Sequence, residues 1–161
     1  MVISAGVAPT GMNAQWQAID DSLFLKQFAA NDGADYADCI GAHANGPDGV
    51  GEIQQVVPRQ LQILGHSRPG CVTEFGYALP VDGQAPKGFD WAMSHTPERQ
   101  AEVLLDGMRW AKQSGTVRLV ILWNLNFDGP VGDPNVPYAL VRKNFESPAV
   151  LAIQSAMNQN P

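Results

Sequence analysis

Short runs of apolar and β-branched residues alternate along the chain with segments whose apolar residues recur at helical spacing. The runs at 2–7, 37–42, 71–75 and 117–123 predict four buried strands. A loop and a segment of helical period follow each run. This order predicts four consecutive strand–loop–helix units, in which helices join parallel strands.

The predicted helices cover residues 20–30, 51–64 and 97–114, and a fourth follows Ser147 and Pro148. The third has the clearest end signals, with Thr96 as N-cap, Pro97 at the first helical position and Gly115 as terminator. Pro58 lies inside the second pattern and predicts a kink or a later start of that helix.

The loops that follow the predicted strands are long, whereas the links that precede the strands are short. The long loops cover residues 8–19, 43–50, 76–95 and 124–146. In α/β folds the loops at the carboxyl ends of the strands form the working face. We expect a single α/β domain over 1–161, built as half of a (β/α)8 (TIM) barrel; the alternative is an open doubly wound parallel sheet.

Composition and charge limit the classes of partner that fit this chain. The 161 residues are 45% hydrophobic, which is enough for a packed core, and carry a net charge of −6. The basic residues are scattered, so we expect neither nucleic acid nor a membrane surface as partner. No apolar run is long enough to span a membrane. No signal-peptide pattern precedes the first predicted strand, so the chain is expected to start inside a fold and its compartment stays open.

Two side chains at predicted strand ends are candidates for chemistry. Glu74 ends the third predicted strand, where a buried carboxylate is costly unless it is paired or used. His43 follows the second predicted strand and shares its rim. The ordinary alternatives are a salt-bridged glutamate and a structural, hydrogen-bonding histidine.

The two cysteines lie in neighbouring predicted strands. Regular alternation places Val72 and Glu74 on one face of their strand and Cys71 on the other, while Cys39 shares the face of His43. We therefore expect no disulfide between Cys39 and Cys71, and the distance from Cys39 to His43 excludes a Cys/His nucleophile pair.

The end of the fourth predicted strand carries groups that suit a sugar. Trp123 either closes the core or offers a flat platform for a pyranose ring. Asn124 and Asn126 offer amide donors and acceptors for hydroxyl groups. Asp128 and Asp133 in the following loop predict turn chemistry rather than a calcium site. No phosphate loop, dinucleotide fingerprint or metal motif is present, and we expect no cofactor.

Four segments, taken in order, resemble strands five to eight of clan A retaining glycoside hydrolases, the (β/α)8 enzymes related to families 5 and 39. The segments are residues 2–11, 38–43, 72–76 and 122–127, and the similarity covers nearly the whole chain. The most specific piece is Thr73-Glu74-Phe75-Gly76.

The resemblance implies roles for these residues. Glu74 matches the nucleophile, and His43 and Trp123 match residues that shape the sugar site. Asn45 stands where the family has an aromatic residue, and we expect it, with Asn126, to bind substrate. The family's acid/base glutamate ends strand four and has no counterpart in this chain. Members of the family are often exported.

The resemblance implies a hydrolase of β-linked glycosides, with a carbohydrate ligand and a second copy of the chain as partners. A half-barrel leaves two sheet edges open, and two copies related by a twofold axis would close one barrel. In that homodimer Leu125 would stand where the acid/base belongs. The alternative is a non-catalytic carbohydrate-binding half-barrel or an inactive fragment.

Overall fold

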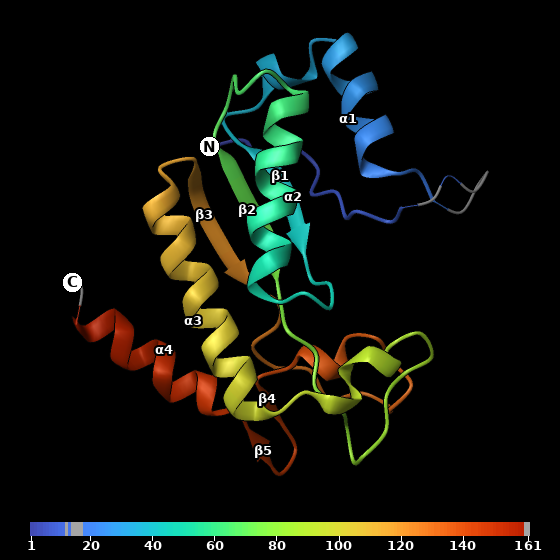
Figure 1. Cartoon of the computed structure of the whole chain (residues 1–161), viewed down its shortest axis with the longest axis vertical. Coiled ribbons are helices and arrows are strands. Elements are labelled where there is room, and N and C mark those ends of the chain that lie inside the picture. Colours follow the sequence, from blue (N-terminus) through green and yellow to red (C-terminus); the bar gives the residue numbers. More distant parts are fainter. Residues whose placement is uncertain (12, 14–17, 160–161) are drawn as a thin grey trace.

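A computed structural model describes residues 1–11, 13 and 18–159 and shows an α/β fold (Figure 1). Its main sheet is parallel, with the strand order β1-β2-β3. These strands are β1 (Ile40–Ala44), β2 (Gly70–Phe75) and β3 (Val117–Leu122). The helices are α1 (Asp21–Ala30), α2 (Val50–Ile63), α3 (Pro97–Ser114) and α4 (Pro148–Gln159). A small antiparallel hairpin is formed by β4 (Val141–Arg142) and β5 (Phe145–Glu146).

The prediction of a regular first strand is wrong. Among residues 2–7 the pairing is limited to isolated parallel bridges, from Ile3 to Cys39 just before β1 and from Val7 to Ala42 of β1. The hydroxyl of Ser4 accepts the N–H of Gly41 at 3.0 Å and so takes the place of a backbone acceptor in the ladder. A side chain within the ladder interrupts regular pairing, so this edge segment stays irregular. Part of the predicted loop 8–19 lies outside the described residues.

The other elements follow the local signals closely. The predictions for β2, β3 and the helices are confirmed to within a few residues, while β1 begins later than predicted, at Ile40. Thr96 caps α3 by accepting the N–H of Arg99 at 3.2 Å, and Gly115 ends it at φ +66°. The helix α2 begins at Val50 and continues through the exposed Pro58, so that residue does not delay its start.

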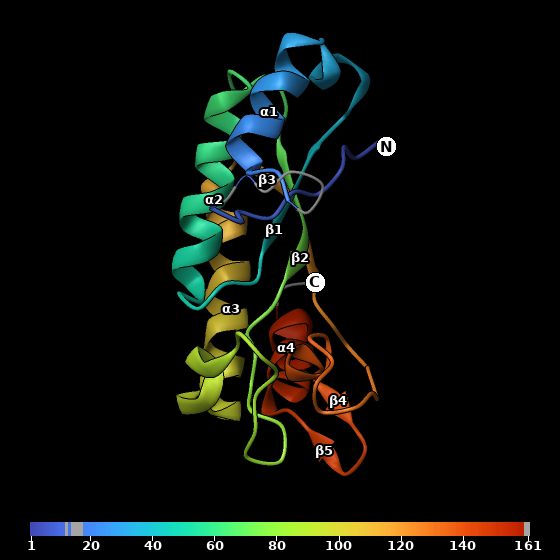
Figure 2. The ribbon, with the colours of Figure 1, turned by 90° about the vertical axis from the view of Figure 1, so that its right-hand side faces the viewer.

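Helices α2 and α3 lie together on one side of the sheet (Figure 2). Phe75 packs against α3 at Gly107, where an added Cβ would lie 2.3 Å from the ring. The strand β3, in contrast, contains no buried residue among its six, and its Ile121 is 45% exposed. An open doubly wound sheet needs helices on both faces, so the arrangement favours part of a barrel. No described helix has the length and hydropathy needed to cross a membrane.

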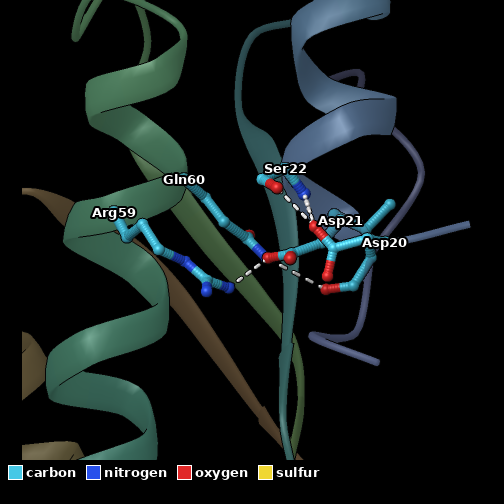
Figure 3. A network of polar contacts seen from close by, with 6 residues as sticks. Asp20, Asp21, Ser22, Arg59 and Gln60 are labelled. Carbon is cyan, nitrogen blue, oxygen red and sulfur yellow. Dashed lines mark hydrogen bonds and ion pairs between the residues drawn. The ribbon is translucent and has the colours of Figure 1, made fainter. Parts of the chain in front are cut away.

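A buried polar network joins α1 to α2 (Figure 3). The carboxylate of Asp21, which is 1% exposed, accepts hydrogen bonds from the side chains of Arg59 and Gln60. The amide of Gln60 also donates to the carbonyl of Val7 at 3.2 Å. A buried charge is tolerated when it is paired in this way. The network therefore fixes residues 2–7, α1 and α2 relative to one another.

The register between β1 and β2 contains a bulge at the site. Ala42 pairs with Val72 but His43 pairs with Glu74, so Thr73 is an extra residue on β2. Consistent with this, Val72 and Phe75 both belong to the buried core although they are three positions apart. A bulge re-aims the side chains beyond it. Glu74 therefore leaves the face of Val72, and the predicted alternation is wrong at this point.

The expectation that the cysteines stay apart is also wrong. Cys39 and Cys71 form a disulfide, with their Cα atoms 5.7 Å apart, and both are fully buried. Gly41 pairs with Cys71 before the bulge, so Cys71 shares the face of Gly41 and Cys39, and the bulge then brings Glu74 to that same face. The prediction derived the face of Cys71 from that of Glu74. Regular alternation puts these two residues, three positions apart, on opposite faces of the strand.

Candidate functional site

The carboxyl ends of β1 and β2 bring three of the predicted site residues together. Glu74 Oε2 accepts a hydrogen bond from Asn45 Nδ2 at 2.9 Å. His43 Nδ1 lies 3.5 Å from the same oxygen, and both of these side chains are 25% exposed. An amide donor and an imidazole thus orient a partly buried carboxylate. Such a group can act as a nucleophile or as a general base.

These residues line a pocket of about 290 Å³ that opens at the rim of the sheet. The remaining wall comes from the end of residues 2–9, the loop after β1 and the first turn of α2. The lining residues are Ala8, Pro9, His43, Asn45, Gly46, Pro47, Glu52 and Glu74. This volume is at the small end of ligand sites, and the pocket carries two carboxyl groups.

Glu52 is the site residue that the sequence argument missed. It lies in the first turn of α2, and its carboxyl group rests on Gly46, where an added Cβ would meet Oε1. Burial, followed by the nearby charge of Asp48, raises the pKa of Glu52 above its ordinary value, against an opposing backbone hydrogen bond. One signal could have found it, because a helix that follows a parallel strand begins at the same rim as the strand end.

Tyr138 is the second residue that was missed. It comes from the loop after β3, and its hydroxyl donates to the carbonyl of Asn45 at 2.8 Å. Burial raises the pKa of Tyr138, and the negative charges of Glu74 and Glu52 raise it further. The phenol therefore remains a neutral donor. The two residues of this hydrogen bond are 93 positions apart in the sequence, so no local sequence pattern predicts it.

Trp123 and Asn126 lie apart from the pocket of Glu74. The backbone N–H of Trp123 donates to the carbonyl of Phe75 at 2.8 Å, and the half-buried ring of Trp123 packs on a cluster that contains Ala78 and Tyr138. The peptide bond from Trp123 to Asn124 is cis. Asn126 is exposed and forms a bridge with Val141. Neither residue is among the described residues that line the pocket of Glu74.

The acidic residues of the loop after β3 make turns. Asp128 accepts the N–H of Lys143 at 2.8 Å, and Asp133 accepts the N–H of Asn135 at 2.9 Å. In the described part of the chain, no group of three histidine, cysteine or acidic side chains is placed to hold a metal ion. The hydrogen bonds of these two aspartates thus account for their place in the loop.

Comparison with known proteins supports the architecture. No protein-family model matches the sequence, and no curated protein matches it either. The structure of the β-D-glucuronidase of Dictyoglomus thermophilum is similar over 78% of this chain, with a TM-score of 0.55 and 18% sequence identity. The chain matches only 23% of the length of that enzyme. The shared feature is the fold, and the chain has the form of a partial TIM-barrel-like unit that resembles part of a glycosidase.

Proposed function

We propose that this chain is a glycoside hydrolase-like half-barrel that acts on β-linked glycosides with Glu74 as the nucleophile. The observation that carries the proposal is the carboxylate at the carboxyl end of β2, oriented by Asn45 and His43 inside a pocket. Active sites of β/α barrels lie at this end of the strands. The fold shared with a β-D-glucuronidase supports the same class of substrate.

The chemistry requires two carboxyl groups. The Glu74 carboxylate attacks the anomeric carbon as the bond to the leaving oxygen breaks, and that oxygen takes a proton from an acid. Water then hydrolyses the glycosyl ester and releases the free sugar. In the resembled family the acid ends strand four, for which the resemblance gives no counterpart among residues 1–161, so we assign the acid to a group outside these residues. Glu52 is the other carboxyl group of the pocket and is tested alongside Glu74.

A second copy of the chain is the partner that we propose. The edge strand β3 has no buried residue, and Ile121 and Leu125 are 45% and 64% exposed. An open strand edge beside exposed apolar side chains favours association. Light scattering should give a molar mass of twice 17.3 kDa. A mass of 17.3 kDa at micromolar concentration would contradict the homodimer.

The test of the enzymatic proposal is Glu74→Gln assayed on a panel of aryl β-glycosides. We expect hydrolysis to fall by about 10²- to 10⁴-fold with an unchanged circular dichroism spectrum, because the amide is not a nucleophile. The matched control is Glu98→Gln, which alters an exposed glutamate in the first turn of α3. Equal activity of wild type and Glu74→Gln would refute the role of Glu74. Loss in Glu52→Gln as well would place the proton donor inside this chain.

A non-catalytic carbohydrate-binding role is the second candidate. The observation that favours it is that the ends of β1 and β3 carry no carboxylate: His43 and Asn45 stand at the end of β1, and Trp123 and Asn124 directly follow β3. In that case oligosaccharides should bind saturably without being hydrolysed. Trp123→Ala should then abolish binding, as measured by calorimetry, while Glu74→Gln should keep it.

A further inference from the structure

A second, larger pocket lies among the loops that follow β2 and β3. Its volume is about 630 Å³, which is within the range of small-molecule sites. It shares no lining residue with the pocket of Glu74. Its walls come from residues 79–82, the start of α3, residues 128–136 and the β4–β5 hairpin. The pocket is therefore distinct from the proposed active site.

The pocket contains an arginine that lacks an acidic partner. Arg142 faces Phe145 across the hairpin, and its guanidinium carbon lies 4.3 Å from the centre of that ring. Within the described part of the chain, its Nη1 donates one long hydrogen bond, to the carbonyl of Val136 at 3.5 Å. Stacking on an aromatic face fixes a guanidinium while its fork of donors stays available. Arg142 is therefore preorganised for a ligand.

Other arginines of the molecule differ in this respect. Arg59, Arg99 and Arg109 each lie within ion-pair distance of a carboxylate. Among the described residues, no carboxylate comes that close to Arg142, although Arg142 is half-buried. Burial lowers the pKa of Arg142, with Asp82 acting weakly in the opposite direction. A partly desolvated, permanently charged group is costly without a counter-charge, and a bound anion would supply one.

The remaining charges of the pocket do not cancel this cation. Asp82 and Asp128 are exposed, so water screens them, and Asp128 is already occupied by the N–H of Lys143. Lys143 is exposed as well, so water screens its charge in the same way. The Nδ1 atom of His95 is engaged with the carbonyl of Ala78 at 2.9 Å. Arg142 is thus the charged group that remains open to a ligand.

The rest of the lining is apolar on one side. Its half-exposed apolar side chains are Pro80, Pro97 and Val131, and the nearly fully buried Leu79, Val81 and Val136 line it as well. A bare inorganic anion would gain nothing from these side chains, whereas a ring with an apolar face would bury surface against them. The combination of one fixed guanidinium and an aliphatic wall specifies a cyclic organic acid better than a free phosphate or sulfate.

We propose that the pocket of Arg142 binds a small cyclic carboxylate, with the carboxylate on the guanidinium fork and the ring on the aliphatic wall. A sugar acid and an alicyclic acid share this chemistry. The site does not depend on Glu74, so binding should persist in Glu74→Gln. It would give the molecule a recognition site beyond the proposed hydrolytic one.

The test is a titration of the ¹⁵N-labelled protein, followed by amide chemical shifts, with four probes. They are D-glucuronate, cyclohexanecarboxylate, D-glucose and sodium sulfate at equal ionic strength. We expect saturable shifts around Arg142 and Phe145 with at least one carboxylate, and none with D-glucose. Preference for D-glucuronate would identify a sugar acid, and preference for cyclohexanecarboxylate an alicyclic one.

Variants connect the binding to Arg142. Arg142→Gln should weaken the binding of the carboxylate at least tenfold, and Arg142→Lys should weaken it less, because the charge stays while the fork is lost. Arg118→Gln, at an exposed arginine of β3, is the matched control. Binding that is unchanged in Arg142→Gln, sulfate binding as tight as that of the carboxylates, or no carboxylate binding at all would overturn the proposal. If Arg142→Gln does not fold, the Arg142→Lys titration decides the question.

Discussion

The two pockets at the loop end of the sheet are built in different ways. The pocket of Glu74 stands on β1 and β2, which are joined by backbone pairing and by the Cys39–Cys71 disulfide. The pocket of Arg142 is enclosed by loops and by a hairpin whose strands have two residues each. The first pocket is acidic, with Glu52 and Glu74, and the second presents a guanidinium without an acidic partner.

This difference separates the roles of paired strands and loops in the two pockets. Groups that must be held accurately lie on paired strands, where the backbone positions them, while loops can vary in order to recognise a ligand. Tyr138 belongs to both regions, because it follows Val136 of the Arg142 pocket and donates to Asn45 beside Glu74. The contrast predicts that perturbing the sheet disturbs the Glu74 pocket first.

The largest effect on stability should come from the disulfide. Cys39→Ala combined with Cys71→Ala removes a link with a sequence separation of 32. Loop-closure entropy of that size stabilises the fold by about 3–4 kcal/mol. Urea unfolding should show this loss in free energy of unfolding, and the wild type treated with dithiothreitol should behave in the same way.

The disulfide variant also tests the contrast between the pockets. The chemical shifts of Glu74 and His43 should move more than those of Phe145 and Arg142, because the lost link joins only β1 to β2. A Cys39→Ala, Cys71→Ala variant as stable as the wild type would show that the disulfide does not stabilise the fold. Larger chemical-shift changes at Arg142 than at Glu74 would show that the sheet does not support the Glu74 pocket in particular.

An intermediate effect should follow Tyr138→Phe. Loss of the hydroxyl leaves the carbonyl of Asn45 without this donor, which costs about 1–2 kcal/mol of unfolding free energy. Asn45 holds Glu74, so hydrolysis should fall too, while carboxylate binding at Arg142 should stay within twofold. Thermal unfolding together with both assays would check this, and equal loss at the two sites would show that Tyr138 supports them jointly.

The smallest effect should be a change in how the free energy of unfolding depends on pH in Glu52→Gln. The pKa of Glu52 is raised above its ordinary 4.5 in the folded state. The folded protein therefore binds the proton more tightly, and the stability from this group is full below pH 4.5 and is lost as pH rises through the folded pKa. Glu52→Gln should remove that loss, so the variant should gain stability relative to wild type from pH 4 to pH 7. If Glu52→Gln gained the same stability at pH 4 as at pH 7, burial of an ionised Glu52 would not be the cause of the gain.

The sequence by itself determined the elements whose signals are local. The cap at Thr96, the terminator at Gly115 and the apolar periods of α2 and α3 predicted helices at the observed places. The run at 71–75 predicted β2, the position of Glu74 and His43 at predicted strand ends placed them at one rim, and the family resemblance added Asn45. Such features depend on neighbours along the chain or on the shared direction of parallel strands, and a single sequence contains both.

Only the tertiary structure decided the rest. The extra residue at Thr73 changes the face of Glu74 relative to Cys71, and nothing in the local pattern distinguishes it from a regular strand. Pairing with β1 creates the bulge, and the register before it, in which Gly41 pairs with Cys71, permits the disulfide that the sequence argued against. Tyr138 and Arg142 reach their places through loops that local propensity does not fix. Contacts between distant segments depend on register and loop path, which are set by the packing of the whole molecule.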